Sequence, residues 1–308
     1  MIFKSTNKPE EANLRYPGRR INMPKVTTDD GIQINYDLDD FTNPWDNVTK
    51  TIGLLHGSTL NMKFYAPMVP YLARKYRVLR WEQRGRGEST APPVGSTLSG
   101  TKVDDGVTVA ERYAKDALCV LDHLGIEKIK WVGDSSGGIT GAYFAVMFPN
   151  RIKSLVCIQS PLVKIPDEFA KAWSAGEKDP ATAIGKYGME SWYDRIGTDW
   201  VTDPTKGNEK FKSWQRAQRK KIATHVYISH WKWQLENDLT PRLPEIRVPT
   251  LFITGDKGGI CPLEQQYRQQ KLVPNSKILI YKDIGHGIAF LEPERVAQDI
   301  LKFLETIG

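Results

Sequence analysis

Two adjacent serines stand among glycines in the stretch WVGDSSGGITG, directly after an apolar run. The pattern Gly-x-Ser-x-Gly fits only one register, in which Gly133 and Gly137 flank Ser135. A serine on a sharp turn from a strand into a helix takes a positive φ, which brings the residues two before and two after it together. Glycine at both positions avoids a clash of Cβ atoms. We therefore predict that Ser135 is a nucleophile; the alternative is a Gly-rich connection whose serines are only hydrogen-bonded.

A serine hydroxyl is a weak nucleophile until a base takes its proton. Among the five histidines, His286 is the best base, because it lies between Gly285 and Gly287 just beyond the apolar run KILIY. The other four are expected in structural or substrate-contacting roles: His56, His123, His225 and His230.

An acid must orient the imidazole and stabilise its protonated form. Asp256 is the acid at the end of the apolar run TLFITG, so the chain order is serine, acid, histidine. Glu264 lies further on in a predicted helix, and Asp283 is only three residues before His286. We predict that Asp256 is the acid, with a capping role in its loop as the alternative, and leave another carboxylate open.

The negative oxygen that forms during acyl transfer needs N–H donors around it. One donor is expected from the residue after the nucleophile, Ser136. The other is expected from Ser58, in the loop after the apolar run that ends in LLHG. We predict that these two N–H groups form an oxyanion hole.

Strands and helices that alternate along the chain must position these groups. Apolar runs typical of strands occur at 50–57, 76–83, 129–135, 154–160, 250–256 and 277–281, and helical spacing at 64–76, 109–125, 138–148 and 293–307. The alternation predicts an α/β fold with a mostly parallel central sheet and helices on both faces. Ligands in such folds bind at the carboxyl ends of the strands.

The alternation is interrupted by a polar, helical, tryptophan-rich segment. We therefore predict an N-terminal arm at 1–25, a core domain at 26–161 and 248–308, and an inserted α-helical cap at 162–247. The cap's aromatic side chains either bind a sizeable apolar or aromatic substrate or form the core of the cap itself. The candidates for substrate binding are Trp192, Trp214, Trp231 and Tyr227.

Five motifs stand in the order found in α/β-hydrolases, and the chain resembles that family from about residue 26 to its end. They are LLHGS (54–58), WEQRGRGES (81–89), GDSSGG (133–138), GDKGGICP (255–262) and GHG (285–287). The chain is similar to the serine-nucleophile branch of enol-lactonases, esterases and carbon–carbon hydrolases, which carries a helical cap. The GDSSGG turn also resembles that of lactonases acting on resorcylic macrolides such as zearalenone.

The resemblance implies a cofactor-free acyl-enzyme mechanism with Ser135, Asp256 and His286. Two positions depart from the family pattern: Glu82 replaces the usual Asp, and Gly258 occupies the usual position of the acid. We expect hydrolysis of an ester or lactone of a sizeable apolar or aromatic molecule. The alternatives are a carbon–carbon bond hydrolase for a dienone or β-diketone on the same triad, and a binding protein without turnover.

Composition limits the partners. The net charge of +7 is spread along the chain, which argues against a nucleic-acid partner. The three cysteines lie far apart, which argues against a disulfide framework and against a zinc site, and we expect neither metal nor cofactor. We see no signal peptide and no long apolar run, so we expect no membrane partner and a cytoplasmic location. A homodimer is left open.

Overall fold

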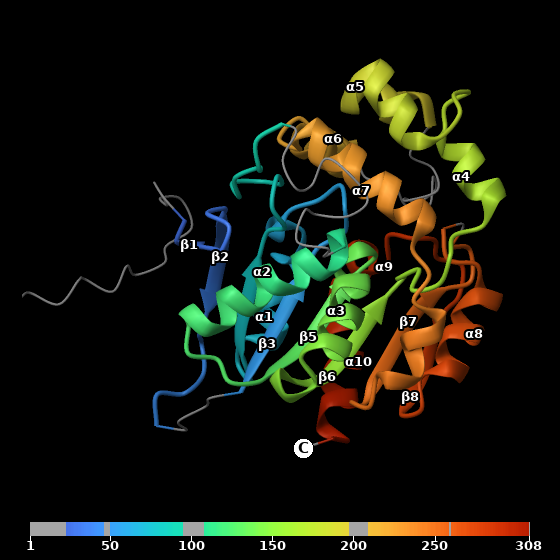
Figure 1. Cartoon of the computed structure of the whole chain (residues 1–308). Coiled ribbons are helices and arrows are strands. Elements are labelled where there is room, and N and C mark those ends of the chain that lie inside the picture. The colour runs from blue at the N-terminus through green and yellow to red at the C-terminus, as the bar shows by residue number, and fades with distance from the viewer. Residues whose placement is uncertain (1–22, 46–49, 95–107, 197–208, 259, 308) are drawn as a thin grey trace, which may run out of the picture.

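A mixed sheet forms the centre of the computed structural model, which describes residues 23–45, 50–94, 108–196, 209–258 and 260–307 (Figure 1). Within these ranges eight strands lie in the order β1-β2-β4-β3-β5-β6-β7-β8. The pairs β1–β2 and β2–β4 are antiparallel, and all the other pairs are parallel. The strands are β1 (Lys25–Thr27), β2 (Gln33–Asp39), β3 (Thr51–Leu55), β4 (Arg77–Trp81), β5 (Ile129–Asp134), β6 (Ile152–Ile158), β7 (Thr250–Gly255) and β8 (Ser276–Tyr281).

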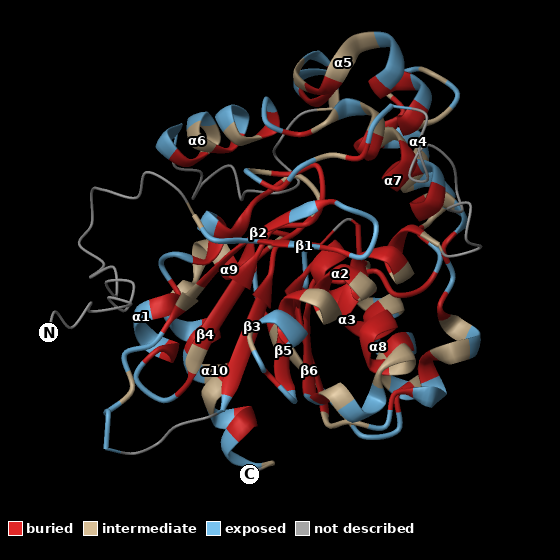
Figure 2. Cartoon of the chain, turned by 60° about the vertical axis from the view of Figure 1, so that its left-hand side comes forward, coloured by how far each residue is buried: buried red, intermediate tan, exposed pale blue. Residues whose placement is uncertain are grey.

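Helices cover both faces of this sheet, so the central strands are buried along their length (Figure 2). Successive side chains of a strand point to opposite faces. Trp131 of β5 accordingly packs with helices α2 and α3, whereas its neighbour Val132 packs with α1 and α10. The helices of these layers are α1 (Val69–Leu72), α2 (Val109–His123), α3 (Ser136–Met147), α8 (Leu263–Leu272), α9 (Ile288–Leu291) and α10 (Pro293–Glu305). The predicted fold class is confirmed.

One predicted helix differs from the observed structure. The segment 64–76 was expected as a single helix, but it forms the short 3-10 helix η1 (Met62–Tyr65) and the single turn α1 (Val69–Leu72). Pro67 lies between the two, and Pro70 occupies the first turn of α1. Proline has no backbone N–H to donate and is tolerated only in the first turn of a helix, so the two prolines divide the segment.

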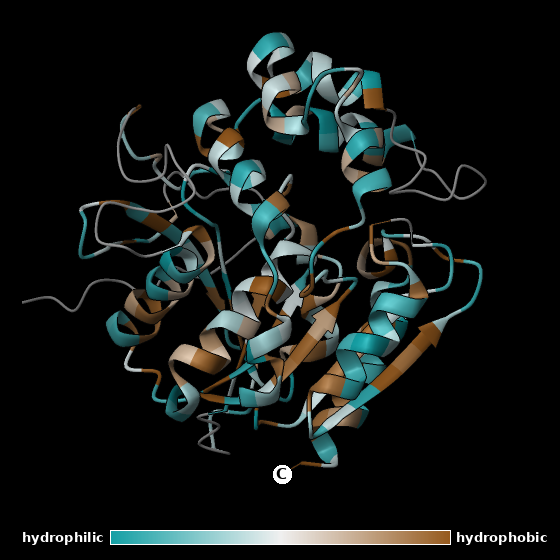
Figure 3. Ribbon diagram, turned by 45° about the vertical axis from the view of Figure 1, so that its right-hand side comes forward, coloured by the Kyte–Doolittle hydropathy of each residue, from teal (hydrophilic) through white to brown (hydrophobic). Residues whose placement is uncertain are grey.

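In the described residues between β6 and β7, four α-helices form a separate layer beyond the carboxyl ends of the strands (Figure 1). They are α4 (Asp167–Trp173), α5 (Pro180–Ile196), α6 (Glu209–Arg219) and α7 (Thr224–Glu236). Their outward faces are largely hydrophilic (Figure 3), while an aromatic cluster that includes Trp173, Trp192 and Trp231 fills the space between them. These helices occupy the segment predicted as a cap, and the 3-10 helix η3 (Thr240–Glu245) leads back to β7. The predicted arm lies mostly outside the described residues.

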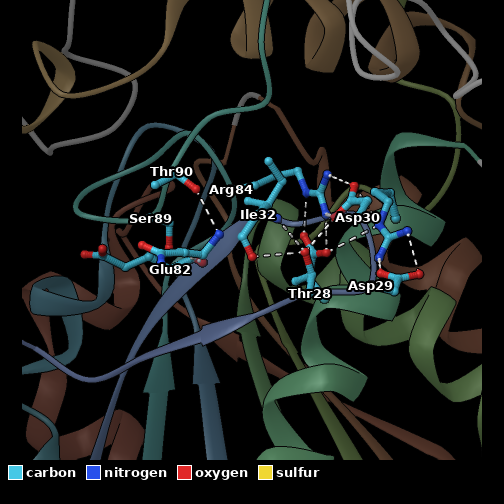
Figure 4. A network of polar contacts seen from close by, with 11 residues as sticks. Thr28, Asp29, Asp30, Ile32, Glu82, Arg84, Ser89 and Thr90 are labelled. Atoms are coloured by element: carbon cyan, nitrogen blue, oxygen red, sulfur yellow. Dashed lines mark hydrogen bonds and ion pairs between the residues drawn. The ribbon is translucent and has the colours of Figure 1, made fainter.

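A buried ionic network joins the β1–β2 turn, the loop after β4 and helix α2 (Figure 4). The Arg84 guanidinium is fully buried and donates to Asp116 at 2.5 and 2.7 Å and to Asp30 at 2.6 Å. Arg112 of α2 donates to Asp29 in the same turn. Glu82, the position that departs from the family pattern, accepts hydrogen bonds from the Glu88 N–H and from Asn35. The longer carboxylate therefore still closes the turn that follows β4.

Candidate active site

Ser135 stands at the turn between β5 and α3 with φ 51° and ψ −116°. A Cβ added to Gly133 would clash with the Gly137 backbone, and one added to Gly137 would clash with the backbone of Leu55 on β3. The turn therefore has the strained backbone and the close approach that the glycine spacing predicts. At this position the serine follows the carboxyl end of a central strand and precedes the N-terminus of a helix.

Ser135 and His286 line the same pocket between the sheet and the cap layer, and this pocket is partly open to solvent. His286 lies in the loop between β8 and α9, is only 8% exposed, and burial lowers its pKa to about 4. At neutral pH the imidazole is thus uncharged, which is the form that can accept a proton. We call this space the His286 lobe; it is lined by Gly57, Ser58, Thr59, Leu60, Phe64, Asp134, Ser135, Trp173, Phe211, Gln215, Ile260, His286, Gly287 and Phe290.

A second hollow adjoins the first, and the two share Ser58, Ser135, Trp173 and Ile260. We call it the His230 lobe, and its remaining wall comes from the start of α3, the segment after β6, and α7. That wall consists of Ser136, Pro161, Ile165, His230, Trp231 and Gln234. Ser135, the predicted nucleophile, therefore lies where the two lobes meet, one toward the histidine loop and the other toward the cap.

Gln159 at the end of β6 holds the histidine loop in place. Its Nε2 donates to the Gly285 carbonyl at 3.0 Å, and its Oε1 accepts from the Thr254 hydroxyl at 3.1 Å. Gln159 has φ 46°, an unusual value for a residue other than glycine. Gln159 is not among the residues predicted from the sequence, where its only signal is a polar side chain at the end of a buried strand beside the predicted site.

Asp256 does not point into either lobe. It is exposed, and its Oδ1 accepts a hydrogen bond from the Asp283 N–H at 2.8 Å. Burial lowers the pKa of His286, and no carboxylate of the described residues is among the causes of this shift. To reach the imidazole, Asp256 would have to leave its bond and turn inward. The hydrogen bond from the Asp283 N–H resembles the capping role that was the alternative for Asp256. It differs in that Asp256 fixes the loop after β8 and not the loop in which Asp256 itself lies.

Asp134 is the carboxyl group in the wall of the His286 lobe. It ends β5, is 3% exposed, and burial raises its pKa to about 8. Its Oδ2 lies 2.9 Å from the position that a Cβ of Gly57 would occupy, and its Oδ1 has no hydrogen-bond partner among the described residues. Asp134 is therefore largely protonated at neutral pH. Asp134 is not among the residues predicted from the sequence, although an acid directly before the serine on a buried strand is a visible signal.

The two predicted oxyanion donors lie next to the serine. Ser136 is the first residue of α3, and the first N–H groups of a helix have no partner within it. A Cβ added to Gly57 would lie 3.4 Å from the Cβ of Ser135. The loop that contains Ser58 therefore lies next to Ser135. Arg86 fixes that loop by donating from Nε to the Ser58 carbonyl at 2.9 Å. Both lobes share Ser58 at their junction.

His56 supports the loop rather than the chemistry. Its Nδ1 is 2.8 Å from the Gly57 carbonyl, and its Nε2 accepts from the Gln83 N–H at 3.3 Å. These two bonds fit a neutral ring that donates through Nδ1, and burial lowers the pKa of His56 to about 3. This agrees with the structural role expected from the sequence.

The four aromatic residues predicted to bind substrate separate into two groups. Trp231 lines the His230 lobe, and the buried Tyr227 hydroxyl lies 3.4 Å from the Ser58 hydroxyl. Trp192 is fully buried in the core of the cap and donates to the Trp173 carbonyl at 2.8 Å, which is the alternative role considered for the cap tryptophans. Trp214 packs beside Phe211 and is not among the lining residues of the two lobes.

Other kinds of site find no support in the described residues. No group of three or more His, Cys, Asp or Glu side chains within the described ranges is arranged to hold a metal ion. No helix in that part of the chain combines the length and apolarity required to cross a bilayer.

Comparison with known proteins agrees with the fold. A bifunctional esterase/perhydrolase of Acinetobacter calcoaceticus is 26% identical over 303 residues, covering 92% of this chain and all of that protein. A 3-oxoadipate enol-lactonase of Acinetobacter baylyi is 28% identical over 200 residues, 63% of this chain and 66% of the enzyme. The crystal structure of an enol-lactonase from Burkholderia xenovorans superposes with a TM-score of 0.77 at 21% identity, covering 92% of this chain and all of that one. These relatives indicate a hydrolase. The profile of the alpha/beta hydrolase fold family matches residues 50–293, and the chain therefore belongs to this family.

Proposed function

We propose that the protein hydrolyses an ester or lactone bond of a sizeable apolar or aromatic small molecule through an acyl-enzyme on Ser135. The observation that carries this proposal is the strained serine at the end of β5, in one pocket with a buried, neutral histidine. The names of the esterase and enol-lactonase relatives support the same bond types.

His286 takes the proton of the Ser135 hydroxyl, and the Oγ of Ser135 forms a bond to the carbonyl carbon of the substrate. The N–H groups of Ser58 and Ser136 stabilise the negative oxygen. The carbon–oxygen bond of the ester then breaks, and the alkoxide takes its proton from His286. Water repeats the sequence on the acyl-enzyme and releases the carboxylic acid and the free serine.

Asp134, rather than Asp256, is the carboxyl group that we place in this mechanism, because it lies in the pocket wall while Asp256 is on the surface. Burial keeps Asp134 protonated below about pH 8. A neutral carboxyl adds no negative charge beside the oxygen that becomes negative during the reaction. If Asp134 were ionised, its negative charge would repel the negative oxygen. This repulsion is strong because the site is poorly solvated.

The walls of the pocket favour an apolar substrate. Leu60, Phe64, Phe211 and Phe290 line the His286 lobe, and Trp173 separates it from the His230 lobe. Neither lobe has an Arg or Lys among its described lining residues. We therefore expect uncharged esters with an aromatic or long apolar acyl group to react faster than short or anionic ones.

Turnover of 4-nitrophenyl esters and of aryl lactones tests this function. We expect wild-type hydrolysis and a loss on the order of 10⁴-fold or more in Ser135→Ala, the range seen when a triad serine is removed. Ser213→Ala, an exposed serine on α6, serves as the control and should hydrolyse like wild type. Unchanged hydrolysis in Ser135→Ala would refute the proposal, and labelling by a fluorophosphonate without turnover of any ester would favour a carbon–carbon hydrolase.

A further inference from the structure

Besides the Trp231 indole, whose Nε1 also has no hydrogen-bond partner among the described residues, three polar side chains line the His230 lobe without satisfying their hydrogen-bonding capacity. The Oγ of Ser136, the Nδ1 of His230 and the Nε2 of Gln234 are buried, and none has a hydrogen-bond partner among the described residues. Buried polar atoms are nearly always paired, because an unpaired one costs about 1–3 kcal/mol. Three such atoms on one pocket wall, beside the reactive serine, indicate that a ligand pairs with them.

The His230 ring is held in place by two aromatic rings. His230 stacks on Tyr227 with ring centroids 5.7 Å apart and an interplanar angle of 10°, and on Tyr113 at 6.4 Å and 24°. His230 and Gln234 are one helical turn apart on α7, so both face the same space. A rigid wall of this kind can select a ligand by hydrogen bonding, because little ordering of the side chains remains for binding.

The wall carries no formal charge. Burial, together with the nearby positive charge of Arg86, lowers the pKa of His230 well below its usual range, so the ring is neutral at physiological pH. Ser136 and Gln234 are neutral groups, and no Arg or Lys is among the described lining residues of the lobe. Arg86 is not among the described lining residues, so a carboxylate buried here would have no direct ion-pair partner, which is unfavourable. These three side chains suit a neutral ligand oxygen that can accept and donate hydrogen bonds.

We propose that Ser136, His230 and Gln234 form a subsite for a neutral hydroxyl, phenol or ketone group of the substrate, so that the preferred substrates are uncharged hydroxylated or keto aromatic esters or lactones. The subsite rests on the proposed function of Ser135, which stands at the junction of the two lobes. Trp231 and Trp173 supply the aromatic walls on either side of the polar group.

Four 4-nitrophenyl esters test the subsite: 3-phenylpropanoate, its 3-hydroxyphenyl and 4-hydroxyphenyl analogues, and its 4-carboxyphenyl analogue. For wild type we expect kcat/KM to be roughly 10-fold higher for the better hydroxyphenyl ester than for the phenyl ester, as for one or two added hydrogen bonds. The carboxyphenyl ester should be the poorest. In His230→Phe and Gln234→Leu, the hydroxyphenyl-to-phenyl ratio should fall to about 1–2, since the partner is lost.

Gln270→Leu is the matched control, because this glutamine lies on α8 and already bonds Ser276. It should keep the wild-type ratio. A wild-type ratio near 1 for both hydroxyphenyl isomers, a preference for the carboxyphenyl ester, or a ratio that survives in both α7 variants would overturn the subsite.

Equilibrium binding separates a failure of the subsite from a failure of the proposed function. The methyl esters of the same phenyl and hydroxyphenyl acids are titrated into Ser135→Ala, and tryptophan fluorescence reports binding. We expect the hydroxyphenyl ester to bind roughly 10-fold more tightly, and Gln234→Leu in the same background to remove the difference. Selective binding without wild-type turnover would retain the subsite and refute only the hydrolase function, whereas equal binding of both esters would refute the subsite.

Discussion

In the mechanism that we propose, the protonation of two pocket residues determines when Ser135 can react. His286 must be neutral to accept the serine proton, and its pKa of about 4 keeps it neutral through most of the acidic range. Asp134 must be neutral to leave the oxyanion unopposed, and its pKa is about 8. The other titratable groups around Asp134 are Tyr65 and Cys261, and burial holds the pKa of each well above its usual value. The alkaline limit of activity is therefore assigned to Asp134.

We predict that kcat/KM for a neutral ester is level from about pH 5 to 7.5 and falls as the pH passes 8, because ionised Asp134 then opposes the oxyanion. Asp134→Asn should remove the alkaline fall, since the amide cannot ionise. The measurement is a pH–rate profile of each protein from pH 4 to 10.

Asp256→Asn is the comparison. It should keep the alkaline fall and change kcat/KM by less than about threefold, because the carboxylate lies on the surface. A loss of about 100-fold or more in this variant, with an unchanged profile in Asp134→Asn, would return the role of the acid to Asp256.

At the scale of elements, buried charge fixes the β1–β2 turn against the loop after β4 and against α2 (Figure 4). Arg84 is fully buried between Asp116 and Asp30. Removing one member of a buried ion pair leaves a charge without compensation, and this costs far more than the pair contributes. The loop after β4 carries Arg86, which holds the Ser58 carbonyl, so the network also supports the predicted oxyanion loop.

We predict that Arg84→Met lowers the free energy of unfolding by about 3–5 kcal/mol, because Asp116 stays buried and keeps only its longer contact with Arg112 at 3.4 Å. Lys75→Met removes an exposed ion pair with Glu305 and should have little measurable effect. Urea denaturation of both variants gives the comparison, and an equally small loss in Arg84→Met would show that the network is not structurally important.

The positions of the elements and the serine turn could be predicted because their causes are local. Gly133 and Gly137 specify the turn around Ser135 by sterics alone, and apolar runs specify the buried strands. The direction of the Asp256 side chain could not be predicted, because it depends on the Asp283 N–H, 27 residues further on.

The cap shows the same limit for the aromatic residues. Trp192 and Trp231 both lie on helices rich in aromatic residues, but Trp192 is enclosed by its neighbours while Trp231 lines the His230 lobe. Sequence spacing predicts which residues share a face of a helix, not which face another helix covers. The division of these residues between cap core and pocket wall therefore required the packing of α5 against α7.

At the scale of the whole molecule, three buried neutral histidines make the fold sensitive to acid. Burial lowers the pKa of His56 to about 3, that of His286 to about 4, and that of His230 well below its usual range. Each is protonated in the unfolded chain below about pH 6.5 but not in the folded protein, so each destabilises the fold as the pH falls. Asp134, whose folded pKa is raised, acts in the opposite direction over the same range and offsets one of the three.

We predict that the free energy of unfolding falls by about 3 kcal/mol for each pH unit between 6.5 and 4, two net protons at about 1.4 kcal/mol per unit. In Asp134→Asn the offset is absent and the slope should be steeper, at about 4 kcal/mol per unit. Denaturant titrations at several pH values measure both slopes. A stability independent of pH across this range would show that the histidines are not buried as neutral groups.

Covalent labelling of Ser135 tests the central claim most directly. The protein is treated with a fluorophosphonate at pH 7, its intact mass is measured, and the modified residue is located by fragmentation of the peptide that contains Ser135 and Ser136. We predict one adduct per chain, located on Ser135 and absent from Ser135→Ala and His286→Ala. An adduct on Ser136, or an unmodified protein after complete exposure, would contradict the assignment of Ser135 as the nucleophile.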